Sequence, residues 1–170
     1  MLARFAQEAG RADQGIIGAG QLSLPQPKKE NSVSNPITGG CLCGNIRYSV
    51  SAPVEEIIAC HCTHCQKSSG TGASHNAAVP TAAVTFTSGK PKRYADTAAS
   101  GNVLNRYFCG DCGSPIYSQR EKLPEMMVLK VGTLDAPNEM KLVMNIWTDS
   151  ARPWLYRDPE VQHYPGNRPV

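Results

Sequence analysis

The sequence predicts an all-β domain, or at least a β-rich one, on three observations. Short runs rich in β-branched and aromatic residues recur along the chain, separated by glycine, proline, asparagine or aspartate. Glycine (15 residues) and proline (13 residues) are frequent, as expected for many turns between short strands. With 170 residues, the chain is long enough for one domain with a modest core and too short for two ordinary ones.

Composition divides the chain into an extension, a domain and a tail. Residues 1–34 are poor in large apolar side chains and end in a proline- and lysine-containing stretch, so we expect an extension with room for one short helix, and then a linker. The domain is expected over residues 35–165 and a short tail over residues 166–170.

Within the domain, six runs are predicted to form strands and hairpins because each is short, rich in β-formers and bounded by turn residues. In chain order these runs are 44–50, 82–88, 91–96, 102–109, 114–120 and 126–134. The segment 66–79 breaks the strand pattern, and we expect an irregular turn or a short helix there. The pattern also leaves further helix open in the last 25 residues.

Charge and hydropathy exclude several classes of protein. Charged residues make up 18% of the chain and the net charge is +3, with lysine and arginine spread along it, so no footprint for nucleic acid or an anionic membrane is expected. No apolar run approaches the roughly 20 residues that span a bilayer. We therefore expect a cytoplasmic protein with a small or local partner. An organellar presequence at the start is the lesser alternative, because Glu8 and Asp13 oppose it.

Seven cysteines carry the chemical signal of this sequence, and they fall into three chelating groups. Their number is odd for a closed disulfide framework and high for a reduced protein without metal, so metal binding is favoured. The groups are "GGCLCGN", "ACHCTHCQ" and "FCGDCGS".

Cys41 and Cys43 form a C-x-C pair, which places both side chains on one face of an extended segment. Cys109 and Cys112 form a C-x-x-C pair, and the glycine after each allows a tight knuckle typical of half a zinc site. Each pair supplies two of the four ligands that a tetrahedral structural zinc requires. We therefore predict that they join into one site, the Cys₄ group, which ties together distant parts of the domain.

The remaining thiols, Cys60, Cys62 and Cys65, form the Cys₃ group. Cys60 and Cys62 share a face by strand alternation, and Cys65 can return to it after a two-residue turn. Three thiolates with no fourth protein ligand predict an open site, as in catalytic zinc centres. His61 is expected to point away from the thiols, and His64 is a neighbour in the turn rather than an expected ligand.

Three alternatives stay open for the cysteines. They could be buried small hydrophobes, although their clustered spacing opposes this. Thiolates also bind iron–sulfur clusters, although C-x-C is not a familiar ferredoxin spacing. Both metal sites could instead be structural, with His64 or His75 closing the second.

Six motifs, in this order, resemble the glutathione-dependent formaldehyde-activating enzyme family over roughly residues 36–165. They are "GGCLCGNIRY", "CHCTHCQKSSG", "FTSGKPKRYADT", "RYFCGDCGSPIYS", "VGTLD" and "IWTDSARPWL". The resemblance implies a β-tent fold of folded antiparallel sheets and two zinc ions per chain. One zinc would be structural, on the Cys₄ group, and the other catalytic, on the Cys₃ group.

The same resemblance implies the reaction and its partners. The family is named for condensing glutathione with formaldehyde to S-(hydroxymethyl)glutathione, which classes it as a carbon–sulfur lyase, so the expected partners are a small thiol and an aldehyde. A proton for the adduct oxygen would come from water, His64 or His75. A non-catalytic glutathione carrier and a zinc-stabilised protein-interaction module are the alternatives. The oligomeric state is left open.

Glutathione carries two carboxylates, which favour cationic partners. Lys67 directly follows the Cys₃ group and Arg106 precedes the second knuckle, so both are candidate glutathione contacts. Each is also the kind of residue that more often sits as a solvated surface charge.

Overall fold

Strands dominate the chain, which confirms the predicted all-β class. The computed structural model describes residues 36–98, 101–137 and 140–168. The predicted extension at 1–34 and the end of the predicted tail lie outside the described residues.

A small antiparallel sheet has the strand order β1-β2-β5. Its members are β1 (Ile37–Gly40), β2 (Arg47–Val50) and β5 (Val84–Ser88). Outside this sheet, Gly39 of β1 forms an isolated antiparallel bridge with Leu134.

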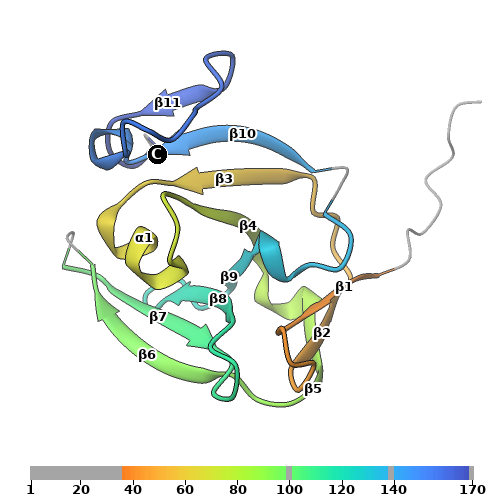
Figure 1. The fold of residues 1–170 in the computed structure, drawn as a ribbon. Coiled ribbons are helices and arrows are strands. Elements are labelled where there is room, and N and C mark those ends of the chain that lie inside the picture. Colours follow the sequence, from red (N-terminus) through yellow and green to blue (C-terminus); the bar gives the residue numbers. More distant parts are fainter. Residues whose placement is uncertain (1–35, 99–100, 138–139, 169–170) are drawn as a thin grey trace, which may run out of the picture. The chain divides into compact units, whose positions relative to one another are not determined.

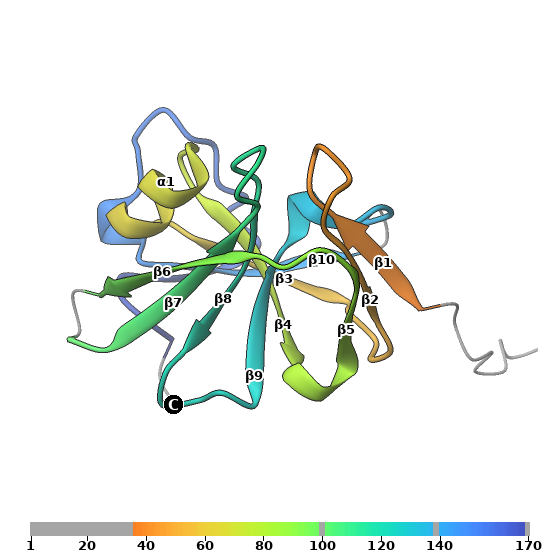
Figure 2. The same ribbon diagram turned by 90° about the horizontal axis from the view of Figure 1, so that it is seen from below.

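A large mixed sheet has the order β11-β10-β3-β4-β9-β8-β7-β6. Its strands are β3 (Glu56–Cys60), β4 (Ser74–Pro80), β6 (Lys92–Thr97), β7 (Val103–Phe108), β8 (Pro115–Arg120), β9 (Met126–Lys130), β10 (Lys141–Ile146) and β11 (Gln162–Tyr164). The sheet curves around the helix α1 (Thr63–Ser69) (Figure 1). Three 3₁₀ turns connect strands: η1 (Thr81–Ala83), η2 (Val131–Thr133) and η3 (Thr148–Ser150). Figure 2 shows α1 and the small sheet on opposite sides of β4 and β9.

Each of the six predicted runs overlaps a strand, but strands β1, β3, β4, β10 and β11 were not predicted. The helix begins earlier than the segment 66–79 in which it was expected, and the second half of that segment is β4. Strand β4 was missed because polar and small residues occupy it where β-formers are usual. Within the last 25 residues, the described part holds η3 and β11 and no α-helix.

The expectation of purely antiparallel sheets is wrong at β10, which pairs in parallel with both β3 and β11. The hairpin-linked strands obey the prediction because a tight turn can join only antiparallel neighbours. Strands β3 and β10 are far apart in sequence, so no hairpin turn sets their relative direction. The β3–β10 ladder also contains an irregularity between Leu142 and Met144.

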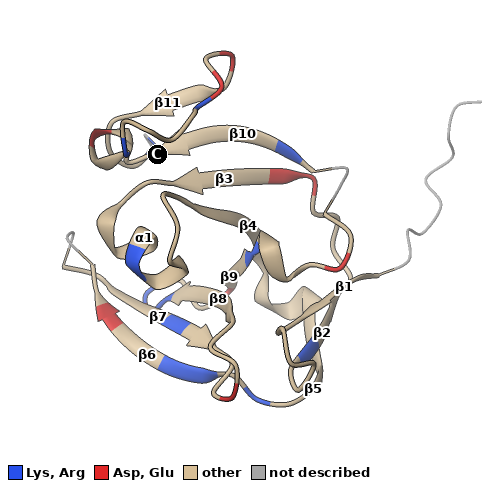
Figure 3. Cartoon of the chain, in the orientation of Figure 1, with Lys and Arg blue, Asp and Glu red and all other residues tan. Residues whose placement is uncertain are grey.

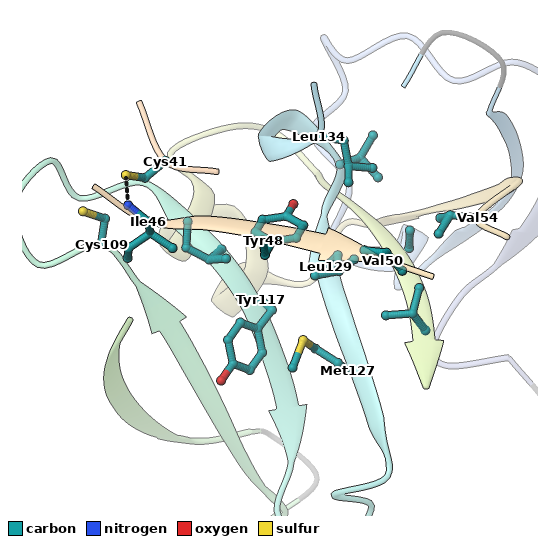
Figure 4. Close-up of a cluster of buried hydrophobic side chains, with 14 residues drawn as sticks. Cys41, Ile46, Tyr48, Val50, Val54, Cys109, Tyr117, Met127, Leu129 and Leu134 are labelled. Atoms are coloured by element: carbon teal, nitrogen blue, oxygen red, sulfur yellow. Dashed lines mark hydrogen bonds between the residues drawn. The ribbon is translucent and has the colours of Figure 1, made fainter. Parts of the chain in front are cut away.

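One face of the large sheet forms the core with the small sheet. Ala77 and Val79 of β4 and Leu129 of β9 are fully buried in the same core cluster as Tyr48 of β2. Figure 4 shows Leu129 close to Tyr48. The Tyr48 hydroxyl is satisfied at 2.8 Å by Thr133 Oγ1 in η2. Because strand side chains alternate, the residues between these core positions must point to the opposite face, on the side of α1.

Lysine and arginine in Figure 3 are spread over β2, β6, β7, β9, β10 and α1, as the sequence suggested. No helix within the described residues is both long and apolar enough to cross a bilayer.

The close approach of β1 to Tyr48 generates a stability prediction. A Cβ on Gly39 would lie 2.5 Å from both the Thr133 carbonyl oxygen and the Tyr48 ring, which is too close for any side chain. Gly39→Ala should therefore lower the free energy of unfolding by about 1–3 kcal/mol, as other overpacked sites do. Urea unfolding followed by circular dichroism measures this loss.

Gly132→Ala is the matched control, because nothing lies within 4 Å of a Cβ at Gly132. Equal unfolding midpoints for the two alanine variants would contradict the close approach at Gly39.

Candidate metal centres

The α1 side of the large sheet is polar, and strand register explains why. Cys60 pairs with Ser74, and Asn76 pairs with Lys130, so these side chains share one face. The same face continues through β8 to Arg106 on β7. We refer to Cys60, Ser74, Asn76, Lys130 and Arg106 as the polar face. Ala77 and Leu129, which alternate with Asn76 and Lys130, belong to the core, so alternation separates the site from the core.

The Cys₄ group comes from two knuckles that face each other. Cys41 and Cys43 follow β1, while Cys109 and Cys112 lie between β7 and β8. Backbone hydrogen bonds close each turn: Ile46 accepts from the Cys41 N–H, and Ser114 accepts from the Cys109 N–H. All four sulfurs lie within 4.8 Å of one another. The predicted union of the two pairs is thus seen in the structure.

Amide and hydroxyl donors surround these sulfurs. The Ile46 N–H donates to Cys41 Sγ over 3.2 Å, beside the Cys109 sulfur at the edge of the core (Figure 4). The Ser114 Oγ accepts from the Leu42 N–H and lies 3.2 Å from Cys112 Sγ. Hydrogen bonding from Ser114 lowers the pKa of the Cys112 thiol to about 5. The surroundings of Cys112 therefore favour the thiolate, the form in which cysteine binds metal.

The spacing of the sulfurs in the Cys₄ group fits zinc. Tetrahedral zinc with bonds of about 2.3 Å places its sulfur ligands about 3.8 Å apart. The sulfurs of Cys41 and Cys43 are 3.4 Å apart, and those of Cys43 and Cys109 are 3.8 Å apart. The donor set of four thiols is also the one that structural zinc prefers.

The Cys₃ group forms where β3 passes into α1. Cys60 ends β3, Cys62 is the N-cap of α1, and Cys65 lies in the first helical turn. The Cys62 Sγ accepts a hydrogen bond from the Cys65 N–H at 3.3 Å, in place of the usual hydroxyl or carboxylate cap. Cys65 thus returns to the shared face through a helical turn, where the sequence predicted a two-residue turn.

The helix α1 is short and held at both ends. It stops at Gly70, which adopts the left-handed conformation (φ 68°) that glycine tolerates as a C-cap. Gln66, which is buried, donates to the carbonyls of His61 and Ser150, and its own oxygen accepts from Arg152. These bonds fix the orientation of a seven-residue helix that would not be stable alone.

The three sulfurs of the Cys₃ group lie within 4.8 Å of one another, and no histidine or carboxylate of the described residues joins them. Cys60 and Cys65 are buried, whereas Cys62 is partly exposed. The set could therefore hold one metal ion through three sulfur ligands.

The histidines are engaged elsewhere. His61 is buried and its Nε2 lies 2.9 Å from Asn145 Oδ1 on β10, away from the thiols as predicted. His64 Nδ1 lies 2.9 Å from Asp96 Oδ1 on β6. His75 is exposed on β4, opposite Ala59. The alternative in which His64 or His75 closes the second site finds no support in this arrangement.

Arg106 is buried, so its interpretation as a solvated surface charge is wrong, whereas Lys67 is exposed on α1. Asp96 Oδ2 accepts from Arg106 Nε and Nη2, each at 2.8 Å. The remaining Nη1 donates to Ser68 Oγ at 3.1 Å and lies 4.0 Å from Cys65 Sγ. The guanidinium thus connects β6, β7 and α1 beside the Cys₃ group.

Lys130 was not identified from the sequence. Its side chain is 7% exposed, and its ammonium donates to Ser74 Oγ at 3.1 Å and to Asn76 Oδ1 at 2.7 Å. A lysine within the apolar run "MMVLKVGTL" was the available signal, because a charge among core-forming residues is expensive to bury without a function. Asp96 was missed as well, since an isolated acid in a strand carries no such signal.

Electrostatics within the Cys₃ group favour one ionised thiol. Hydrogen bonds from Cys60 and Cys62 lower the pKa of Cys65, and the charges of Lys130 and Arg106 lower it further, although burial opposes them. Hydrogen bonding to Cys62 raises the pKa of Cys60. The two cations therefore stabilise negative charge at the Cys65 sulfur, as a metal-binding thiolate needs.

Two cavities lie along α1, and Lys130 and Pro115 line both of them. One, of about 260 Å³, is lined by aromatic rings, including Tyr94 and Phe108, and by Arg106. The other, of about 290 Å³, is lined by hydroxyl-bearing and small residues. Together they provide apolar and polar space for a small ligand on the side of α1.

Comparison with known proteins agrees with the motifs. A family model described as glutathione-dependent formaldehyde-activating enzyme matches residues 36–150, a span that includes both cysteine groups. The chain is also similar to a Rhodobacter sphaeroides protein of known crystal structure, with 20% sequence identity and a TM-score of 0.45, over 75% of this chain and 98% of that one. None of the curated proteins matches the sequence.

The buried ion pair beside the Cys₃ group generates a prediction about stability and pH. Burial alone would raise the pKa of Asp96, but hydrogen bonds from Arg106 and His64 outweigh it and lower that pKa. Asp96→Asn leaves Arg106 buried without its counter-ion and should lower the free energy of unfolding at pH 7 by about 3–5 kcal/mol. Because the folded-state pKa is depressed, this contribution is complete above about pH 4 and is lost as the pH falls further.

Chemical unfolding of wild type and variant between neutral and acid pH tests this expectation. Asp135→Asn is the control, because Asp135 pairs with Arg47 at an exposed position and should contribute less than about 1 kcal/mol. A difference between wild type and Asp96→Asn that stays constant down to pH 2 would show that the Asp96 carboxylate is not the source.

Proposed function

The chain belongs to the glutathione-dependent formaldehyde-activating enzyme family, and we propose that it is a zinc-dependent enzyme that joins formaldehyde to glutathione or a related thiol. The reaction produces S-(hydroxymethyl)glutathione in the nominal case and is classed as a carbon–sulfur lyase reaction. The observation that carries the proposal is the Cys₃ group: three sulfurs within 4.8 Å, with no fourth side-chain ligand among the described residues.

Zinc bound by Cys60, Cys62 and Cys65 would hold an incoming thiol as a thiolate at neutral pH and orient it toward the aldehyde. The chain's own residues would do the rest. Hydrogen bonds from Cys60 and Cys62 lower the pKa of Cys65 and would keep this ligand ionised, and the charges of Lys130 and Arg106 add to this effect. Cys62 is the partly exposed member of the group, so it marks the side from which the thiol would enter.

The proton for the adduct oxygen would come from water or from a nearby histidine. His64 is the better placed of the two candidates, because Asp96 holds its Nδ1 and its other ring nitrogen, Nε2, would deliver the proton. His75 lines the cavity of about 290 Å³. We propose both His64 and His75 as candidate proton donors, alongside water.

We propose that the thiol's body lies in the cavities beside the Cys₃ group. Arg106 lines the aromatic cavity and is the better candidate for a carboxylate of glutathione. Its charge is already balanced by Asp96, so it would bind through its Nη1 as a hydrogen-bond donor. Lys67 is exposed on α1 and would contact a carboxylate that projects from the site.

The Cys₄ group would hold a second, structural zinc, giving two zinc ions per chain. Its four thiols come from two chain segments, in which Cys43 and Cys109 are 66 positions apart. The metal would therefore tie the small sheet to β7 and β8. A reducing compartment such as the cytoplasm suits a chain whose described cysteines are all free thiols.

A non-catalytic glutathione carrier and a zinc-stabilised interaction module are the alternatives. A module needs a closed second site, and the engagement of His64 with Asp96 opposes closure by that residue. A carrier would bind glutathione without accelerating its reaction with formaldehyde, so a rate measurement separates carrier from enzyme.

Removing one ligand of the structural site should destroy the fold. Structural zinc contributes about 10 kcal/mol or more to the folding of small metal domains. Cys112→Ser should therefore unfold or aggregate the protein, as size-exclusion chromatography and circular dichroism would reveal. A soluble Cys112→Ser protein with the wild-type melting temperature would overturn the structural assignment.

The catalytic site should respond to glutathione. Glutathione that binds the native state should raise the melting temperature of the zinc-loaded protein, and saturation at about 100 times Kd corresponds to about 2.7 kcal/mol. Cys62→Ser should abolish this shift and lower the zinc-to-protein ratio by one, while the fold persists. Differential scanning fluorimetry and elemental analysis provide the two readouts.

If Cys62→Ser unfolds the domain as severely as Cys112→Ser, the second site is structural and the enzyme proposal fails. A shift with another thiol but not with glutathione would keep the chemistry and change the substrate. His61 is unsuitable as a neutral control, because it is buried against Asn145.

A further inference from the structure

Lys130 is a buried cation to which the proposed chemistry gives only a secondary role, that of lowering the pKa of Cys65 further. Its ammonium donates two hydrogen bonds, both to neutral acceptors, Ser74 Oγ and Asn76 Oδ1. Among the ion pairs of the described ranges, none includes Lys130, whereas Arg106 is neutralised by Asp96. An ammonium has three donors, so one N–H of Lys130 has no acceptor within the part of the chain that the structure describes.

Such a residue is costly for stability alone. Burying an ammonium without an anionic partner is strongly unfavourable, and an apolar side chain of the same length would fit a core strand better. Ser74 and Asn76 orient the charge without neutralising it. This arrangement holds a positive charge ready for an anion that arrives from outside the chain.

The position of Lys130 indicates where that anion lies. Lys130 lines both cavities. Its ammonium donates to Ser74, the cross-strand partner of Cys60, so it lies on the same face of the sheet as the Cys₃ group. A molecule that lies in these cavities with its reacting end toward the Cys₃ group would therefore place that end on the face that carries the ammonium.

We propose that Lys130 is a further catalytic residue, which binds the aldehyde oxygen and stabilises its negative charge while the thiol adds to the carbon. This inference rests on the proposed function. The thiol loses its proton, its sulfur forms the bond to the carbonyl carbon, and the π electron pair of the C=O bond moves to oxygen. The resulting alkoxide accepts a hydrogen bond from Lys130 and then takes from solvent the equivalent of the proton that the thiol lost.

Lys130→Met and Lys130→Gln test the proposal. Methionine keeps an unbranched chain without charge, and glutamine also keeps a donor for Asn76 Oδ1, which protects the fold if the methionine variant is unstable. The catalysed rate of adduct formation from glutathione and formaldehyde is measured by proton NMR exchange, with the uncatalysed rate subtracted. Both variants should lose about 10²–10³-fold in this rate, as enzymes do when one donor to a developing oxyanion is removed.

Two readouts separate this role from a structural one. If Lys130 acts on the aldehyde oxygen, the zinc-to-protein ratio and the glutathione-induced rise in melting temperature stay at wild-type values in both variants. Lys141→Met is the control, because Lys141 is an exposed lysine at the start of β10 and should keep the wild-type rate.

The outcomes are distinguishable. A wild-type rate no faster than the uncatalysed one would refute the proposed function and the inference with it. An active wild type with Lys130 variants within about threefold of its rate would refute the inference and leave the function standing. Loss of zinc or of the glutathione shift in the variants would likewise overturn it, in favour of a role in holding the thiolates or the thiol.

Discussion

The alternation of side chains along β4 and β9 is the constraint on which the rest of this structure depends. These two central strands direct Ala77 and Leu129 into the core and Asn76 and Lys130 to the opposite face. One face must be apolar because it packs against the small sheet. The other must be polar because it faces α1 and the thiols of the Cys₃ group. A shift of one residue in register would exchange the two faces, so core packing and site geometry are specified together.

The two cysteine groups place different demands on the chain. The Cys₄ group joins turns that are distant in sequence and needs only that both knuckles be closed, which the local hydrogen bonds around Cys41 and Cys109 accomplish. The Cys₃ group is local, within six residues, but needs a precise passage from strand to helix. Distant contacts then hold that passage in place: Gln66 reaches Ser150, and Arg106 reaches Ser68. The Cys₃ group therefore depends on more of the fold than the Cys₄ group does.

Spacing rules predicted which cysteine sulfurs lie together, because the spacing within each chelating group is local and can be read directly from the sequence. The union of Cys41 and Cys43 with Cys109 and Cys112 followed from counting ligands. Strand β4 escaped prediction for the opposite reason: its pattern reflects the site as well as the core, and Ser74 and Asn76 there look like turn residues. The parallel pairing of β10 is set by long-range packing that no local pattern records. Local rules fail most where a strand serves a site, as expected for natural proteins.

The histidines show that hydrogen-bond partners distant in sequence determine whether a side chain next to the cysteines joins the metal-binding cluster. His61 and His64 stand among the thiols in sequence, yet Asn145 and Asp96, each more than thirty residues away, bind them. These bonds engage one nitrogen of each ring, and among the described residues the cluster has thiol ligands alone. A cluster of thiolates carries excess negative charge, which buried cations must balance. Arg106 is already paired with Asp96, so Lys130 is the cation whose charge is available to the site, and the reaction proposed for this chain develops its negative charge beside that residue.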